Sequence, residues 1–192
     1  MQIKTEPNLR YGILLSGGID SAILLYLLIK GNPEIKIQPF TIAKRDGAAL
    51  YADPVIEHFN IKFDLSIPKT ILVGDPQAHH RMQSTTAVID IFDNHPVDYL
   101  FIGINKNPPG LDRSPFAPRR NKKSDDPKII FPFVDMTKDQ MLQIMFDCGQ
   151  EDLINITHTC TEQSLGRCNR CWQCQERAWA FKQLGKEDTG VT

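Results

Sequence analysis

Residues 9–21 read LRYGILLSGGIDS, and this stretch decides the fold. Its first seven residues form a short apolar run that predicts a buried strand, and the Ser-Gly-Gly at 16–18 indicates a tight turn. Apolar residues are nearly continuous over 19–29, where they predict a buried helix that ends at Gly31. The stretch therefore predicts a strand, a glycine loop and a helix in direct succession.

The same alternation continues along the chain. Further strands are expected at 35–42, 61–67 and 99–104, and further helices at 48–59, 77–92, 137–146 and 172–184. Strands that alternate with helices predict an α/β fold with a mostly parallel sheet and helices on both faces. Because ligands bind beyond the carboxyl ends of such strands, we expect residues 16–21, 44–47 and 103–107 to converge on one crevice.

The glycine loop has the composition of an anion-binding site. Gly17 and Gly18 let the backbone approach a ligand closely, while the first amides of the following helix present the positive end of its dipole. This arrangement predicts phosphate or pyrophosphate binding, with hydroxyl donors from Ser16 and Ser21 and with Asp20 as a magnesium ligand. The loop matches neither the Walker A sequence nor GxGxxG, and the alternative interpretation is a simple turn.

Composition and charge exclude several classes of protein. The 192 residues are 41% hydrophobic and 23% charged, which is typical of one folded domain and excludes a disordered or fibrous chain. The net charge of -1 gives no global attraction to nucleic acid or to anionic membranes, so direct nucleic-acid binding is not indicated. Because the apolar runs are too short to span a bilayer and no signal-peptide core is present, we expect a cytoplasmic protein.

Four of the five cysteines form a cluster with the spacing C-x7-C-x2-C-x2-C, at Cys160, Cys168, Cys171 and Cys174. Zinc prefers four thiolate ligands in tetrahedral geometry, and four protein ligands leave no position for a reactive water. The spacing therefore predicts a structural zinc site, although it does not exclude an iron–sulfur cluster. Cys148 lies outside the pattern and is interpreted as a structural thiol.

The glycine loop and the cysteine spacing together resemble the 7-cyano-7-deazaguanine synthase family of PP-loop ATP pyrophosphatases. In that family an SGGxDS loop near the N-terminus accompanies a C-terminal zinc site with this spacing, followed by an arginine and an Ala-Phe pair. Here the corresponding residues are Arg177 and Ala180-Phe181. Looser correspondences lie between the two motifs, at Arg45, Arg81, Gly103, Pro132 and Lys138.

This resemblance implies a Rossmann-like PP-loop fold and an ATP-dependent carbon–nitrogen ligase of queuosine biosynthesis. Residues 1–150 would form the ATP-binding domain, and residues 151–192 its helical zinc-binding extension. The enzyme would adenylate 7-carboxy-7-deazaguanine, release pyrophosphate, and react the product with ammonia to give the amide or nitrile. ATP, Mg²⁺ and Zn²⁺ are the implied cofactors, and relatives suggest a homodimer. The residues assigned to pyrophosphate are Ser16, Gly17, Gly18, Ile19, Asp20 and Ser21, and those assigned to catalysis are Asp20, Arg45, Arg81 and Lys106.

The chain departs from the family pattern after the fourth strand, where residues 105–110 read NKNPPG and a basic stretch follows. This difference leaves open a related enzyme that modifies another nucleobase, a tRNA or DNA. A non-enzymatic zinc module is a second alternative, with charge and stacking from Arg167, Arg170, Trp172 and Arg177. The basic residues of the stretch are interpreted either as a lid or as a solvated loop, namely Arg113, Arg119, Arg120, Lys122 and Lys123.

Overall fold

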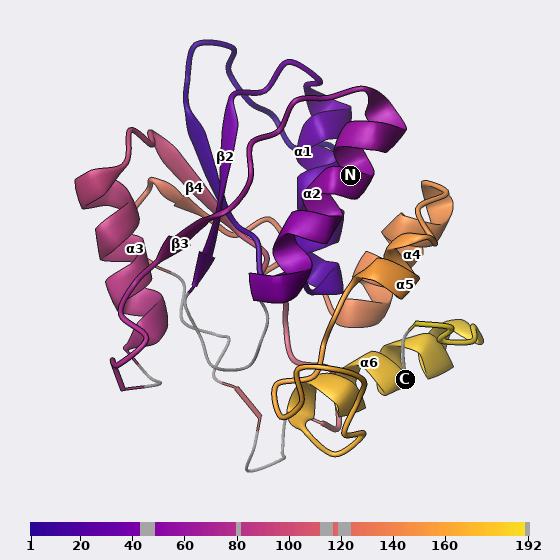
Figure 1. Ribbon diagram of the computed structural model, residues 1–192. Helices are drawn as coiled ribbons and strands as arrows, with labels where there is room; N and C mark the ends of the chain where they lie inside the picture. Colours follow the sequence, from indigo (N-terminus) through magenta and orange to yellow (C-terminus); the bar gives the residue numbers. More distant parts are fainter. Residues whose placement is uncertain (43–48, 80–81, 112–116, 119–123, 191–192) are drawn as a thin grey trace.

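The computed structural model describes residues 1–42, 49–79, 82–111, 117–118 and 124–190. In this part of the chain, five strands form one sheet (Figure 1). Its strands are β1 (Tyr11–Leu14), β2 (Ile37–Ile42), β3 (Ile71–Val73), β4 (Tyr99–Ile102) and β5 (Ile129–Ile130). Their order is β3-β2-β1-β4-β5, and every neighbouring pair is parallel.

β1 is the central strand, and its register places Gly12 opposite Gln38 of β2 and Leu100 of β4. Because all the strands run the same way, the carboxyl ends of β1, β2 and β4 lie at one edge of the sheet. The glycine loop follows β1 directly and is therefore placed at that edge. The predicted α/β fold with a parallel sheet is confirmed.

Helices cover both faces of the sheet. In Figure 1, α3 lies on one side of the strands, while α1 and α2 lie on the other beside the group formed by α4, α5 and α6. The helices are α1 (Ile19–Gly31), α2 (Ala49–Phe63), α3 (Gln83–Asn94), α4 (Lys138–Asp147), α5 (Leu153–Ile156) and α6 (Trp172–Leu184). No helix within the described ranges combines the length and apolar character needed to cross a membrane.

The hydrophobic core has two parts because successive side chains of a strand point to opposite faces. Ile13 belongs to the larger cluster, in which α1 packs with α2, α4 and α6. Phe40 and Leu100 belong to the smaller cluster under α3. The larger cluster also contains Leu153 and Phe181, so the C-terminal segment shares a core with the sheet. The division at residue 150 stays a prediction.

One predicted strand, at 61–67, is wrong. α2 continues to Phe63, and the chain turns at Asp64, which has a positive φ of 53°. The helix extends this far because Phe59 and Phe63 lie four residues apart and stack with a centroid distance of 5.9 Å. The third strand instead begins at Ile71. Helical spacing of aromatic side chains outweighs the alternating pattern that suggested a strand.

Other predicted elements are close to those observed. α4 begins after Thr137 with a capping box completed by Gln140, and α6 spans the predicted residues. α3 begins at Gln83, six residues later than predicted. The short elements α5 and β5 have too few residues to give a periodic pattern, and the sequence did not predict them.

Candidate functional site

The glycine loop joins β1 to α1 over residues 15–18. Gly17 has a φ of +71°, and a Cβ at this position would lie 2.5 Å from Cβ of Tyr51 and 2.8 Å from the backbone nitrogen of Ala52. The loop therefore requires glycine both for its backbone conformation and for its close contact with α2. The loop lies directly before α1, and the first backbone amides of this helix have no acceptors within the helix.

Two serines brace the loop from within. Oγ of the buried Ser21 donates to the Gly18 carbonyl at 3.0 Å and accepts the Ser16 amide at 3.2 Å. Ser16 Oγ in turn accepts the Gly18 amide at 3.3 Å. Ser21 thus shapes the loop from the protein side, whereas Ser16 also lines the adjoining pocket.

Replacing Gly17 by Ala is expected to lower the free energy of unfolding by about 2–5 kcal/mol, from backbone strain at positive φ plus overpacking against Tyr51. Gly149→Ala is the matched control, because Gly149 also has a positive φ of 64° but no atom within 4 Å of an added Cβ. It should lose only the strain component. Urea denaturation measures both variants, and equal losses would contradict the close packing of the loop on α2.

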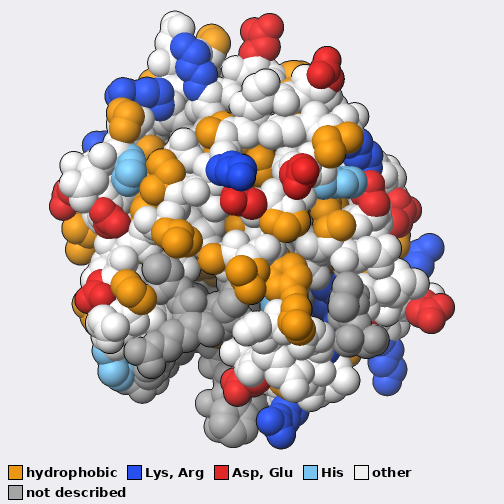
Figure 2. Space-filling view, viewed as in Figure 1, with side chains coloured by type: hydrophobic (Ala, Val, Ile, Leu, Met, Phe, Trp, Pro, Cys, Tyr) orange, Lys and Arg blue, Asp and Glu red, His pale blue; other side chains and the backbone are white. Residues whose placement is uncertain are grey.

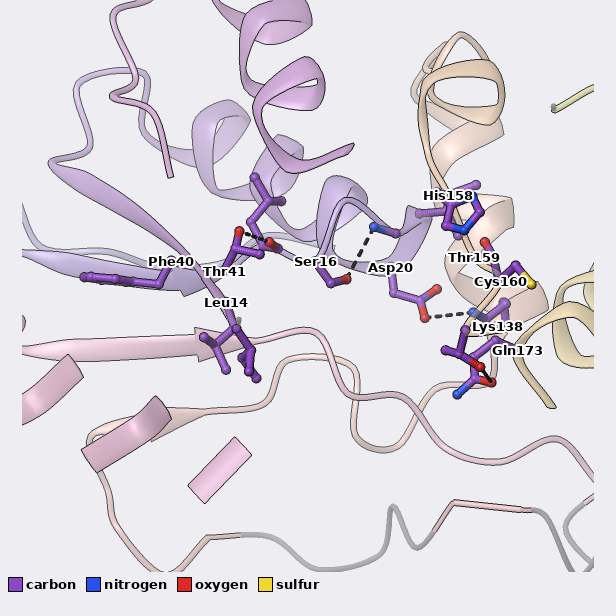
Figure 3. Close-up of a pocket in the computed structure, with 15 residues that line it drawn as sticks. Leu14, Ser16, Asp20, Phe40, Thr41, Lys138, His158, Thr159, Cys160 and Gln173 are labelled. Atoms are coloured by element: carbon purple, nitrogen blue, oxygen red, sulfur yellow. Dashed lines mark hydrogen bonds and ion pairs between the residues drawn. The ribbon is translucent and has the colours of Figure 1, made fainter. Parts of the chain in front are cut away.

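A pocket of about 220 Å³ opens beside the glycine loop at the carboxyl edge of the sheet (Figure 3). One wall is apolar and comes from the ends of β1 and β2, while the opposite wall comes from the segment before α6. The lining residues named here in chain order are Leu14, Leu15, Ser16, Gly18, Ile19, Asp20, Phe40, Thr41, Ile42, Lys138, His158, Thr159, Cys160, Thr161 and Gln173. Of the three segments predicted to converge, residues 16–21 contribute to the lining of this pocket, residues 103–107 are not among its lining residues, and residues 44–47 lie outside the described part of the chain.

A group of ion-paired side chains lies at the loop end of this pocket. Lys138 Nζ, which is 3% exposed, lies 2.8 Å from Asp20 Oδ2 and 3.2 Å from Glu176 Oε2. Asn105 Nδ2 donates to Glu176 Oε1 at 3.1 Å. In Figure 3 a dashed line joins the Asp20 carboxylate to the Lys138 ammonium, which lies directly beside it. A carboxylate and an ammonium therefore lie next to the helix amides.

The segment before the cysteines is attached to the glycine loop. The backbone N–H of His158 donates to the Gly17 carbonyl at 3.0 Å, and the His158 ring stacks on Tyr51 with centroids 4.4 Å apart. Tyr51 Oη also donates to the Ser164 carbonyl at 2.7 Å. His158 thus joins the loop, α2 and the cysteine segment, and it does not belong to the metal-ligand cluster identified among the described residues.

The four predicted cysteines converge. The Sγ atoms of Cys160, Cys168, Cys171 and Cys174 all lie within 4.8 Å of one another, so they could hold a metal ion. Four thiolates bound to one zinc at about 2.3 Å would lie about 3.8 Å apart, which fits this cluster. Cys160 also lines the pocket described above, so the metal cluster and the pocket share a residue.

The thiols differ in acidity because their surroundings differ. A hydrogen bond from the Arg170 backbone lowers the pKa of the Cys168 thiol to about 6, whereas burial raises the pKa of Cys174 to about 12. Cys171 donates its backbone N–H to Cys168 Sγ at 3.2 Å. Backbone donors to sulfur stabilise a thiolate, which is the form that binds a metal.

Arg177, which follows the cysteines, anchors α6. It is 1% exposed, and it donates to the Ile154 carbonyl, to Thr159 Oγ1 and to the Asp188 carboxylate at 2.9–3.1 Å. Burial alone would raise the pKa of Asp188, but hydrogen bonds and charge from Arg177 and Arg167 outweigh burial and lower it. Residues 186–190 are therefore held against the rest of the protein.

The structure does not place every predicted site residue. Arg45 and Arg81 lie outside the described residues, as do all five basic residues of the 113–123 stretch. Lys106 is exposed, donates its backbone N–H to the Met136 carbonyl, and is not among the pocket-lining residues named above. The catalytic roles assigned to these residues stay predictions.

Sequence reasoning missed the pairing around Lys138 and the role of Glu176. In the sequence Lys138 shows only a loose correspondence to the family, and Glu176 lies between Cys174 and Arg177. The sequence does not reveal that Glu176 is buried, because glutamate is mostly exposed in proteins. Its partner lies on another helix and could not be identified from the sequence.

Comparison with known proteins supports the resemblance. Residues 115–185 match the family model described as queuosine biosynthesis protein QueC. The chain is also 23% identical over 219 residues to 7-cyano-7-deazaguanine synthase of Prochlorococcus marinus (strain MIT 9312), covering 93% of this chain and 96% of that protein. The region that resembles QueC includes the entire cysteine cluster and α6.

A solved structure is also similar to this chain. It is the U34-tRNA thiolase NcsA from Methanococcus maripaludis with its [4Fe-4S] cluster. The TM-score is 0.46 at 17% identity, and the match covers 74% of this chain and 57% of the thiolase chain. The α/β fold itself rests on the parallel sheet and its covering helices.

Proposed function

We propose that this chain is an ATP-dependent ligase that adenylates the carboxylate of a 7-deazaguanine and then reacts it with ammonia. The observation that carries the proposal is the convergence of Asp20 and Lys138 beside the glycine loop, in a pocket whose far wall includes Cys160. A loop of helix amides with a buried ammonium suits polyphosphate, and the apolar wall from Leu14 and Ile42 suits a purine.

The side chains fit separate parts of magnesium-bound ATP. Asp20 Oδ1 is buried and has no hydrogen-bond partner among the residues that the structure describes, and such a carboxylate oxygen fits a hard cation such as Mg²⁺. Ser16 Oγ and the amides of Gly18 and Ile19 would bind the phosphate oxygens. Lys138 would neutralise the negative charge that develops on the departing pyrophosphate.

The proposed reaction makes a poor electrophile reactive. A carboxylate oxygen of the acceptor attacks the α-phosphorus of ATP, and the bond from that phosphorus to the β-phosphate bridging oxygen breaks. Pyrophosphate leaves with the electron pair. Ammonia then attacks the acyl carbon, and AMP departs to give the amide, while a second ATP would activate the amide oxygen toward the nitrile. The protein's contribution is to position the reactants and to neutralise charge.

The zinc of the cysteine cluster has a structural role in this proposal. Four thiolates occupy the coordination sphere of the ion, so the cluster would hold the far wall of the pocket in place. A homodimer and a division at residue 150 are part of the same proposal.

Supplying 7-carboxy-7-deazaguanine and ammonia to the metal-loaded protein tests the proposal. We expect acceptor-dependent formation of AMP, measured by nucleotide chromatography, together with an amide or nitrile product detected by mass spectrometry. Omitting the acceptor is the control and should leave ATP intact. ATP binding without turnover on this acceptor would instead favour a related enzyme with another nucleobase, tRNA or DNA substrate, as the different sequence at 105–110 suggests.

A further inference from the structure

Glu176 is a charged side chain with no contact with solvent. Its exposed fraction is 0%, and its carboxylate binds Lys138 Nζ at 3.2 Å and Asn105 Nδ2 at 3.1 Å. Burying a carboxylate carries a large desolvation cost, which its ion pair only partly offsets. A buried ion pair is therefore weak evidence for a role in stability, and Glu176 needs another explanation.

The position of Glu176 on α6 connects two sites. Cys171 is the N-cap of this helix, and Cys174 lies in its first turn, two residues before Glu176. Arg177, which follows Glu176 on α6, hydrogen-bonds to Thr159 and Asp188 and so fixes this part of the helix. The first two turns of α6 therefore carry metal ligands, a structural anchor and a contact to Lys138 at once.

Lys138 is shared between two carboxylates from different helices. Asp20 belongs to the first turn of α1, beside the glycine loop, and Glu176 belongs to α6. If Glu176 lost its charge, the attraction that draws the ammonium away from Asp20 would weaken. Asp20 would then be less able to attract a second cation.

We infer that Glu176 is a positioning residue that couples the cysteine cluster to the nucleotide pocket, by drawing the Lys138 ammonium partly away from Asp20. This inference rests on the proposed function, because it assigns a purpose to the charge on Asp20. The metal fixes the start of α6, α6 fixes Glu176, and Glu176 sets the place of the Lys138 ammonium. Magnesium-dependent nucleotide binding is the property that this arrangement controls.

The first test uses Glu176→Gln, which keeps the size of the side chain and removes its charge. Binding of a non-hydrolysable ATP analogue is titrated against Mg²⁺ by calorimetry, with the metal content of the protein measured in parallel. The Mg²⁺ concentration for half-maximal binding should rise on the order of tenfold, the size of one lost hydrogen bond between charged groups, while the metal content stays at the wild-type level.

Asp188→Asn is the matched control for this test. Asp188 is also a carboxylate of the C-terminal segment and is partly buried, 13% exposed, but it pairs with Arg167 and Arg177 instead of Lys138. It should lower stability without moving the Mg²⁺ dependence. The same shift in both variants, or no shift in Glu176→Gln, would overturn the inference.

A second measurement needs no nucleotide, and it separates this inference from the proposed function. Lys138 is 3% exposed and should resist an amine-directed label, read by peptide mass spectrometry. We expect faster labelling in Glu176→Gln, and faster labelling of the wild type after chelation of its metal. Chelation should not increase the rate of Lys138 labelling further in Glu176→Gln, because this variant already lacks the ion pair between α6 and Lys138. Equal increases in both proteins would refute the coupling even if ATP binding were confirmed.

If the wild type bound no ATP analogue, the proposed function would fail, and the labelling result would still decide whether Glu176 transmits the state of the cluster to Lys138. If the wild type bound the analogue but turned over no 7-deazaguanine, only the acceptor assignment would fail. The two proposals therefore have separate outcomes.

Discussion

Replacing Asp20 by Asn is expected to reduce AMP formation by about 10²–10³-fold, the scale found when one preorganised electrostatic contact to a transition state is removed. The substitution keeps the shape of the side chain but removes the charge that faces Lys138 at 2.8 Å. It also removes the proposed magnesium ligand from the loop end of the pocket. Nucleotide chromatography under saturating ATP measures the loss.

The variant should remain folded, because Lys138 keeps its ion pair with Glu176. Asp98→Asn is a suitable control, since Asp98 also pairs with a basic side chain, Arg10, but lies before the amino end of β4, at the opposite edge of the sheet. It should turn over ATP like the wild type. If Asp20→Asn retained comparable turnover, the glycine loop would not be the phosphate site. A non-enzymatic module would tolerate the change without loss of partner binding.

The second large effect is expected from the cysteine cluster. Cys174→Ser should lose bound metal and lower the melting temperature by about 10 °C or more, because metal binding to a structural site contributes directly to folding free energy. Cys174 is buried at the start of α6, so its loss would release the helix that carries Arg177 and Glu176. Calorimetry and elemental analysis of the purified protein give the two readouts.

Cys148→Ser provides the matched control, because Cys148 lies outside the cluster and contacts Lys30 instead. It should keep its metal and most of its stability. Indistinguishable behaviour of the two serine variants would contradict a metal site at the four cysteines. The same elemental analysis separates zinc from iron, since the spacing alone leaves both open.

Local signals predicted the parts of the fold that local interactions determine. The strand, loop and helix at 11–31 were predicted because apolar runs and turn residues follow one another there without interruption. α4 carries its own cap at Thr137, and α6 has Cys171 as its N-cap and Cys174 in its first turn. The prediction of a strand at 61–67 was wrong because Phe63 also packs on Tyr26 of α1, and this contact depends on the tertiary fold.

Part of the candidate site was also predictable from local sequence. The glycine loop and the cysteine cluster each consist of residues close together in the chain, so the spacing of those residues indicates the chemistry. The contact between Asp20 and Lys138 spans 118 residues, and only the packing of α4 against α1 brings it about. Glu176 had no sequence signal of its own that specified a partner, which is why its connection to the pocket required the structure.

The two walls of the pocket come from opposite ends of the chain, with Ser16 on one side and Gln173 on the other. During synthesis the N-terminal wall leaves the ribosome long before its counterpart exists. A nascent chain therefore has no finished pocket until α6 has been translated and has docked. Premature termination before α6 should yield a product in which one wall of the pocket is incomplete, and with it the proposed nucleotide site.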